Sequence, residues 1–193
     1  MATNQEDAIR LLSDPAAFGA GTDHVDRIET HVSVVFLGHD RVFKLKRAVV
    51  FPYLDFSTPE KRRLACEAEI RINRRTAPTL YLGVLAILRQ ADGTLALRRA
   101  GEEGGDVVDW VVEMRRFDQD TLFDRLARKG ELTRALIEDL ADRIADFHHQ
   151  AEVCNESGAG GRAGTGMIIK SNAECFGQSV SGILDSGKTD TLT

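Results

Sequence analysis

The chain has 193 residues, of which 42% are hydrophobic and 28% are charged, and its net charge is -5. This composition supports a globular protein, either one large domain or two small lobes, and it lacks the basic excess that is typical of nucleic-acid binding. No apolar run reaches the ~18 residues of a membrane helix, and the first residues are polar rather than signal-like. We therefore expect a cytoplasmic protein with no nucleic-acid partner and no membrane partner.

The N-terminal part of the sequence predicts a short helix followed by strands. Residues 3–6 have the spacing of a capping box, and an apolar stripe follows them before Ser13-Asp14-Pro15 ends the helix. From Val25 to Lys46 the pattern changes to period two, which predicts a strand ending near Thr30 and then a hairpin with its turn at residues 38–40.

The middle of the sequence predicts one helix and three further strands. A helix is expected over residues 59–75, because Ser57 and Glu60 have capping-box spacing and Pro59 lies in the first turn. Apolar runs at 80–88, 94–98 and 107–114 predict strands. The first half is therefore expected to be an antiparallel sheet with one helix inserted after its third strand.

The C-terminal part has helical periodicity from Thr121 onward, with a stop at Lys129-Gly130 and a long helix containing residues 136–151. We expect a lobe boundary that separates residues 1–116 from residues 117–193. The glycine-rich stretch at 158–166 is predicted to be mobile. His148-His149 ends the long helix, where histidines complement the helix dipole more often than they bind metal, so no metal ligands are predicted.

Two other features of the sequence are assigned no function. Residues 182–189 match the Gly-x-x-x-x-Gly-Lys-Thr phosphate-loop pattern, but Ile183 and Leu184 occupy positions that favour small residues, and no convincing strand precedes them. We interpret residues 173–192 as part of the helical lobe. The three cysteines form no Cys-x-x-Cys pair, which predicts reduced thiols and no zinc site; they are Cys66, Cys154 and Cys175.

A lysine on the third strand and a glutamate on the following helix are the strongest candidate site residues. Such a pair can hold the phosphates of a nucleotide. Lys44 is the preferred lysine for this role, and the strand periodicity leaves Lys46 as an alternative. A second alternative is that Lys44 is only a solvated lysine at a strand edge. Glu67 has arginines at helical spacing and is expected on the charged outer face, whereas Glu69 borders the apolar stripe and is expected to pair with Lys44.

Several runs of the sequence resemble the aminoglycoside-phosphotransferase-like kinase family, in particular a bacterial branch in which this domain is fused to a C-terminal P-loop ATPase domain. The resemblance covers roughly residues 8 to 152. The runs that carry it are Glu29-Thr30-His31-Val32-Ser33, Val42-Phe43-Lys44-Leu45-Lys46-Arg47, Tyr53-Leu54-Asp55-Phe56-Ser57, residues 73–84 and Val112-Glu113-Met114-Arg115-Arg116-Phe117-Asp118.

The resemblance implies an α+β fold, namely a protein-kinase-like small lobe followed by a truncated helical large lobe. It implies ATP and Mg²⁺ as cofactors and a small-molecule acceptor whose identity is unknown. Lys44 and Glu69 would hold the nucleotide phosphates, Ser33 would lie near them, and the backbone of Glu113 and Met114 would hold adenine at a hinge.

The catalytic residues of that family cannot be placed on this sequence. No His-Gly-Asp or His-Arg-Asp motif occurs, and Gly38-His39-Asp40 is a predicted turn that precedes Lys44. We therefore assign no catalytic base and expect a kinase-like homologue that is inactive by itself. A noncatalytic binding or regulatory module and a gene fragment are the alternatives.

Overall fold

The computed structural model describes residues 5–99, 101–102 and 105–151. The chain divides into two compact units, Met1–Phe147 and His148–Thr193, and nearly all described residues belong to the first. The glycine-rich stretch, the phosphate-loop pattern and the interpretation of residues 173–192 lie outside the described residues, as do Cys154 and Cys175. The expected lobe boundary near residue 116 stays a prediction.

The first unit is an α+β structure built on a six-stranded antiparallel sheet with the strand order β1-β2-β3-β8-β6-β7. The strands of this sheet are β1 (Asp26–Glu29), β2 (Ser33–Leu37), β3 (Arg41–Lys46), β6 (Tyr81–Arg89), β7 (Leu95–Arg99) and β8 (Asp106–Arg115). The helices are α1 (Glu6–Ser13), α2 (Pro59–Asn73), α3 (Phe123–Lys129) and α4 (Arg134–Gln150), with 3-10 turns η1 (Pro15–Phe18) and η2 (Gln119–Thr121). The predicted antiparallel sheet, with its helix after the third strand, is confirmed.

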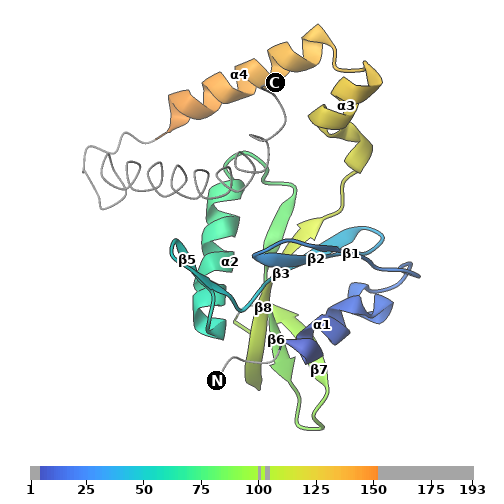
Figure 1. Ribbon diagram of the computed structural model, residues 1–193, viewed down its shortest axis with the longest axis vertical. Helices are drawn as coiled ribbons and strands as arrows, with labels where there is room; N and C mark the ends of the chain where they lie inside the picture. The colour runs from blue at the N-terminus through green and yellow to red at the C-terminus, as the bar shows by residue number, and fades with distance from the viewer. Residues whose placement is uncertain (1–4, 100, 103–104, 152–193) are drawn as a thin grey trace, which may run out of the picture. The chain divides into compact units, whose positions relative to one another are not determined.

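The central strands separate two helices (Figure 1): β3, β8 and β6 lie between α2 and α1 in that view. Side chains alternate along each strand, so one set packs against α1 and η1 and the other against α2. The α1 side forms a cluster that includes Leu12, Phe36, Phe43 and Val111. The α2 side forms a second cluster that includes Cys66, Ile70, Trp110 and Val112.

Local details differ from the prediction at three places. Thr58, rather than Ser57, caps α2: the Thr58 hydroxyl accepts the Lys61 amide at 3.3 Å, while the Ser57 hydroxyl donates to Asp55 at 2.6 Å. A two-strand hairpin, β4 (Val50–Phe51) and β5 (Leu54–Asp55), occupies the predicted loop after β3. The 3-10 turn η1 is the third difference, because no element was predicted there. Thr3, the expected cap of the first helix, lies outside the described residues.

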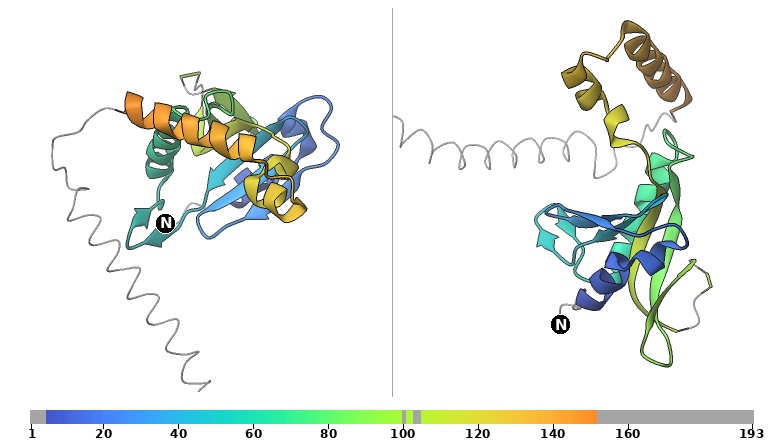
Figure 2. Two further views of the ribbon diagram at one scale, coloured as in Figure 1. Left: turned by 90° about the horizontal axis from the view of Figure 1, so that it is seen from above. Right: turned by 90° about the vertical axis from the view of Figure 1, so that its right-hand side faces the viewer.

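The 3-10 turn η1 closes the α1 side of the sheet. Phe18 at its end packs against Phe43 of β3, with 4.5 Å between the ring centroids and 34° between the ring planes. The β2–β3 turn passes directly beside Phe18, and a Cβ atom at Gly38 would collide with the Phe18 ring. Glycine is therefore required at this turn by close packing. The β6–β7 hairpin can be followed by its green colour in Figure 2.

A buried ion pair links α2 to the sheet. The Arg62 side chain is 0% exposed and its Nε donates to Oδ1 of Asp109 on β8 at 2.7 Å, while Nη1 donates to the Phe56 carbonyl at 2.8 Å. The second Asp109 oxygen accepts Gln5 Nε2 at 2.7 Å, and Gln5 also accepts the Ala48 amide at 2.8 Å. This network therefore connects the start of α1, the strand β8, the helix α2 and the segment that follows β3.

Cys66 lies inside the interface between α2 and the sheet and is a free thiol. Burial raises the pKa of the Cys66 thiol to about 12. A thiol with such a pKa stays protonated at neutral pH and is a poor nucleophile or metal ligand. Cys66 therefore acts as a small apolar side chain in this cluster.

Replacing Arg62 tests the contribution of the buried pair. We expect Arg62→Met to lower the free energy of unfolding by about 3–5 kcal/mol, because it leaves the Asp109 carboxylate buried without its charged partner. Arg63→Met is the matched control, since Arg63 is the next residue of α2 and pairs with Glu60 and Glu67 near the surface. Urea denaturation measures both. Equal losses for the two variants would contradict a stabilising role for the buried pair.

Candidate functional site

Two lysines and one glutamate form a charged cluster between β3 and α2. Lys44 Nζ donates to Glu69 Oε1 at 2.9 Å, and Lys46 Nζ donates to Glu69 Oε2 at 2.6 Å. The predicted Lys44–Glu69 contact is therefore present, and Lys46 joins it rather than replacing it. Glu67 pairs with Arg63 at 2.7 Å near the surface, as the helical spacing indicated.

Elements of regular structure place the three side chains. Lys44 and Lys46 are two residues apart on β3 and so point to the same face of the sheet, which is the face that α2 covers. Glu69 follows Arg62 by seven residues, or about two helical turns, so both side chains emerge from the same side of α2. The buried Arg62–Asp109 pair thus orients the helix in the position that brings Glu69 over the two lysines.

The two lysines differ in their access to solvent. The Lys46 side chain is only 7% exposed and its ammonium lies 5.3 Å from the centre of the Phe56 ring, which is a cation–π geometry. The Lys44 side chain is 29% exposed. Lys46 is therefore held inside the cluster, whereas Lys44 can reach a bound molecule.

The charges of the cluster do not cancel. Burial by itself raises the pKa of Glu69, but the hydrogen bonds from Lys46 and Lys44 outweigh burial and hold the pKa below its ordinary value of 4.5. Glu69 is therefore a carboxylate at neutral pH. Two ammonium groups around one carboxylate leave one net positive charge, which favours an anionic ligand.

Apolar side chains form a platform beside the cluster on the same face of the sheet. In the strand register Met114 lies opposite Val42 on one side and Tyr81 on the other. In the next row Val112 lies opposite Lys44 and Val84. Among these side chains Val42 and Val112 are buried, whereas Met114 and Tyr81, which are partly exposed, leave apolar surface open beside Lys44.

The remaining predicted site residues occupy different places. Ser33 is buried at the start of β2, directly opposite Lys46 in the register, so its side chain shares the face of the two lysines. Glu113 and Met114 both lie within β8, flanked by β3 and β6. The Met114 side chain faces α2, whereas that of Glu113 faces the α1 side. The proposed adenine contact of their backbone stays a prediction.

Sequence reasoning missed the buried Arg62–Asp109 pair, and two signals could have revealed it. Arg62 precedes Cys66 and Ile70 by four and eight residues, so it continues the buried stripe of α2. Asp109 interrupts the apolar run of β8 between Val108 and Trp110. Charged residues in such positions are rarely buried unless they are paired.

Metal and membrane features are absent from the part of the chain that the structure describes. Within residues 5–99, 101–102 and 105–151, no cluster of three or more His, Cys, Asp or Glu side chains is placed to hold a metal ion. Over the same residues, no helix has both the length and the apolar character needed to cross a membrane.

Comparison with known proteins finds relatives of unknown function. The chain is 31% identical over 128 residues to proteins of Mycobacterium tuberculosis and Mycobacterium bovis that are described as uncharacterized. The match covers 66% of this chain but only 23% of each relative, so the chain spans about a quarter of their length. No family model and no solved structure matches the chain.

The pH dependence of stability tests the charge state of Glu69. A carboxyl group whose pKa is lowered by folding stabilises the fold above its unfolded-state pKa, and this contribution is lost as the pH falls through the lower pKa of the folded protein. We therefore expect Glu69→Gln to destabilise the protein at pH 7 and the difference from wild type to shrink below pH 4.5. Glu67→Gln is the control on the same helix, and it should change stability little at either pH. A Glu69→Gln deficit that is the same at every pH would contradict this charge assignment.

Proposed function

We propose that the sheet and α2 form the nucleotide-binding small lobe of a kinase-like phosphotransferase that uses ATP and Mg²⁺. The observation that carries the proposal is the contact of 2.9 Å between the strand lysine Lys44 and the helix glutamate Glu69. In protein kinases the equivalent strand lysine contacts the nucleotide phosphates and is oriented by the helix glutamate.

The surroundings of Lys44 support this proposal. The net positive charge of the cluster suits phosphate, and the partly exposed Met114 and Tyr81 beside it offer apolar surface for the base. Ser33 lies on the same face. Mg²⁺ would arrive bound to the phosphate oxygens, because magnesium is commonly held by substrate phosphates together with few protein groups.

The proposal assigns different tasks to the two lysines. Lys46 keeps Glu69 in place by a second ion pair, so Glu69 stays directed at the sheet when Lys44 turns to phosphate. Lys44 contributes charge to the ligand. In this arrangement the described residues bind and orient a nucleotide, and no group that activates an acceptor hydroxyl is assigned among them.

A structural role is the second candidate, and one observation favours it. Glu69 is only 12% exposed and both of its oxygens accept a lysine ammonium, which is also what a tie between a helix and a sheet requires. Under this alternative the chain is a noncatalytic module that uses the small-lobe shape for contacts with a partner.

Nucleotide titration separates the two candidates. We expect Lys44→Ala to weaken binding of Mg-ATP by roughly tenfold or more, since a hydrogen bond between charged groups is lost. The fold should persist because Lys46 still pairs with Glu69. Lys61→Ala is the control, because Lys61 is an exposed lysine of α2 that pairs with Asp55. Isothermal calorimetry measures both. Equal ATP affinity in wild type and Lys44→Ala would favour the structural candidate.

Phosphoryl transfer by the isolated chain is the second test. The 193 residues contain no His-Gly-Asp or His-Arg-Asp motif. Because such a motif supplies the residue that positions the acceptor hydroxyl, we expect no Mg-dependent transfer at ordinary kinase rates of about 1–100 per second. Release of ADP in the presence of candidate acceptors can be followed with a coupled assay. Turnover at those rates would show that other residues of this chain perform the transfer.

A further inference from the structure

A hollow on the α1 side of the sheet contains an unsatisfied buried carboxylate oxygen. It has a volume of about 440 Å³ and lies among η1, β3, β6, β7 and β8. Apolar side chains that line it include Phe43, Leu85 and Leu97. The charged residues that line it are Arg41, Arg98, Arg99, Glu102 and Glu113. Because Glu113 is adjacent to Met114 on β8, the hollow opens on the face of the sheet opposite to Lys44.

Glu113 is the unusual residue in this hollow. Its side chain is 2% exposed, and Oε1 accepts Arg41 Nη1 at 3.0 Å. Its Oε2 atom is buried and accepts no hydrogen bond from any residue that the structure describes. A buried carboxylate oxygen without a donor is costly, so the geometry points to a donor that comes from another molecule.

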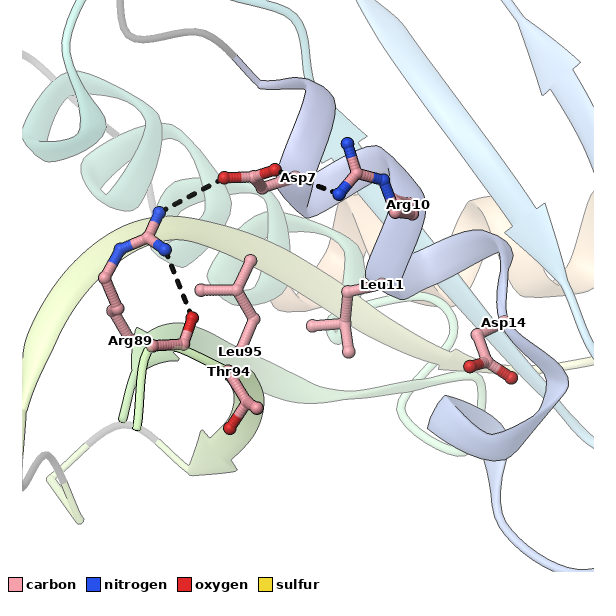
Figure 3. A pocket seen from close by; sticks show the side chains of 8 residues that line it. Asp7, Arg10, Leu11, Asp14, Arg89, Thr94 and Leu95 are labelled. Atoms are coloured by element: carbon pink, nitrogen blue, oxygen red, sulfur yellow. Dashed lines mark hydrogen bonds and ion pairs between the residues drawn. The ribbon is translucent and has the colours of Figure 1, made fainter. Parts of the chain in front are cut away.

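A neighbouring hollow shows the contrast (Figure 3). It is lined by residues of α1 and the β6–β7 hairpin, and Asp7 lies between Arg10, at 3.4 Å, and Arg89, at 3.3 Å. Arg89 also donates to the Gly93 carbonyl at 3.3 Å. The Asp7 carboxylate there is paired with two arginines within the protein. In contrast to Glu113, it therefore does not require a hydrogen-bond donor from a ligand.

The strand order sets the spacing of charges in the Glu113 hollow. Glu113, Leu85 and Arg99 lie on the successive strands β8, β6 and β7, and Leu85 is opposite Arg99 in the register. Neighbouring strands are about 4.8 Å apart, and Glu113 is opposite Gly83, which precedes Leu85 on β6 by two residues, so the backbones of Glu113 and Arg99 are roughly 12 Å apart across an apolar floor. Gly83 is opposite Glu113 on β6, and a Cβ atom at Gly83 would meet nothing within 4 Å.

We propose that this hollow binds a basic amino acid, lysine or arginine, in an extended conformation. Its side-chain cation donates to Glu113 Oε2, its aliphatic stem lies over Leu85 and Leu97, and its carboxylate faces Arg99. A simple cation is disfavoured by the surrounding arginines, and a simple anion offers no donor to Glu113. A molecule with opposite charges separated by a methylene chain pairs with Glu113 at one end and with Arg99 at the other. This site is separate from the proposed nucleotide site.

Three matched ligands test the proposal by calorimetry on the full chain. Norleucine has the lysine stem without the terminal ammonium, and cadaverine has the lysine stem and terminal ammonium without the carboxylate. We expect lysine to bind wild type roughly tenfold or more tightly than either, because each analogue loses one charged hydrogen bond. Equal affinity for lysine and norleucine, or no binding of lysine, would overturn the proposal and show that Glu113 Oε2 is met by water only.

Two variants test which residue contacts each end of the bound lysine. In Glu113→Gln the preference for lysine over norleucine should disappear, and in Arg99→Ala the preference for lysine over cadaverine should disappear. Each comparison is between the affinities of two ligands for the same variant protein. A change in the stability of the variant therefore affects both affinities alike. Arg99→Ala should leave Mg-ATP affinity unchanged because Arg99 lies outside the proposed nucleotide site. Persistence of either ligand preference in its variant would contradict the assigned contact.

Gly83→Leu offers a further check that keeps every charged group. A side chain at this position should fill the open space opposite Glu113 and reduce lysine affinity at least tenfold. Unchanged lysine affinity in Gly83→Leu would place the ligand elsewhere. Failure of this site would leave the nucleotide proposal intact, since that proposal is tested by Lys44→Ala and ATP.

Discussion

The buried ion pair between Arg62 and Asp109 is the contact on which the arrangement of this protein depends. Both side chains are almost fully enclosed, with 0% and 1% exposure. An ion pair in such a place is strongly directional, because each charge must find its partner or remain buried without one. It fixes the rotation of α2 about its own axis, and Gln5 adds the start of α1 to the same anchor. The helices on the two faces of the sheet are thereby connected through one aspartate.

The position of Glu69 follows from that anchor. Seven residues after Arg62, Glu69 points to the same side of α2, where two lysines of β3 meet it. One lysine is buried and the other is partly open to solvent. The cluster therefore combines a permanent structural contact, through Lys46, with a cation that is available to a ligand, through Lys44. This division explains how one cluster is compatible with both a binding role and a structural role.

The strand β8 carries chemistry on both faces. Val112 and Met114 contribute apolar surface beside the lysine cluster, while Glu113 between them projects into the hollow on the α1 side. Alternation along a single strand thus separates a site suited to an anion from a site with an unsatisfied carboxylate oxygen. The two sites share the same backbone but no side chain, so each can be tested independently of the other.

The sequence by itself determined the six strands of the main sheet, the main helix and the choice of Glu69 over Glu67. These features depend on periodicity and on contacts within one element, and side chains three or four residues apart are neighbours on any helix. Tertiary structure alone decided the pairing of Arg62 with Asp109, the addition of Lys46 to Glu69 and the open oxygen of Glu113. These contacts join residues 23 to 72 positions apart in the chain, and their partners are chosen by the register of strands and the rotation of a helix. Local patterns indicate which side chains are buried, but they do not say which partner each one meets, because that is set by the packing of whole elements.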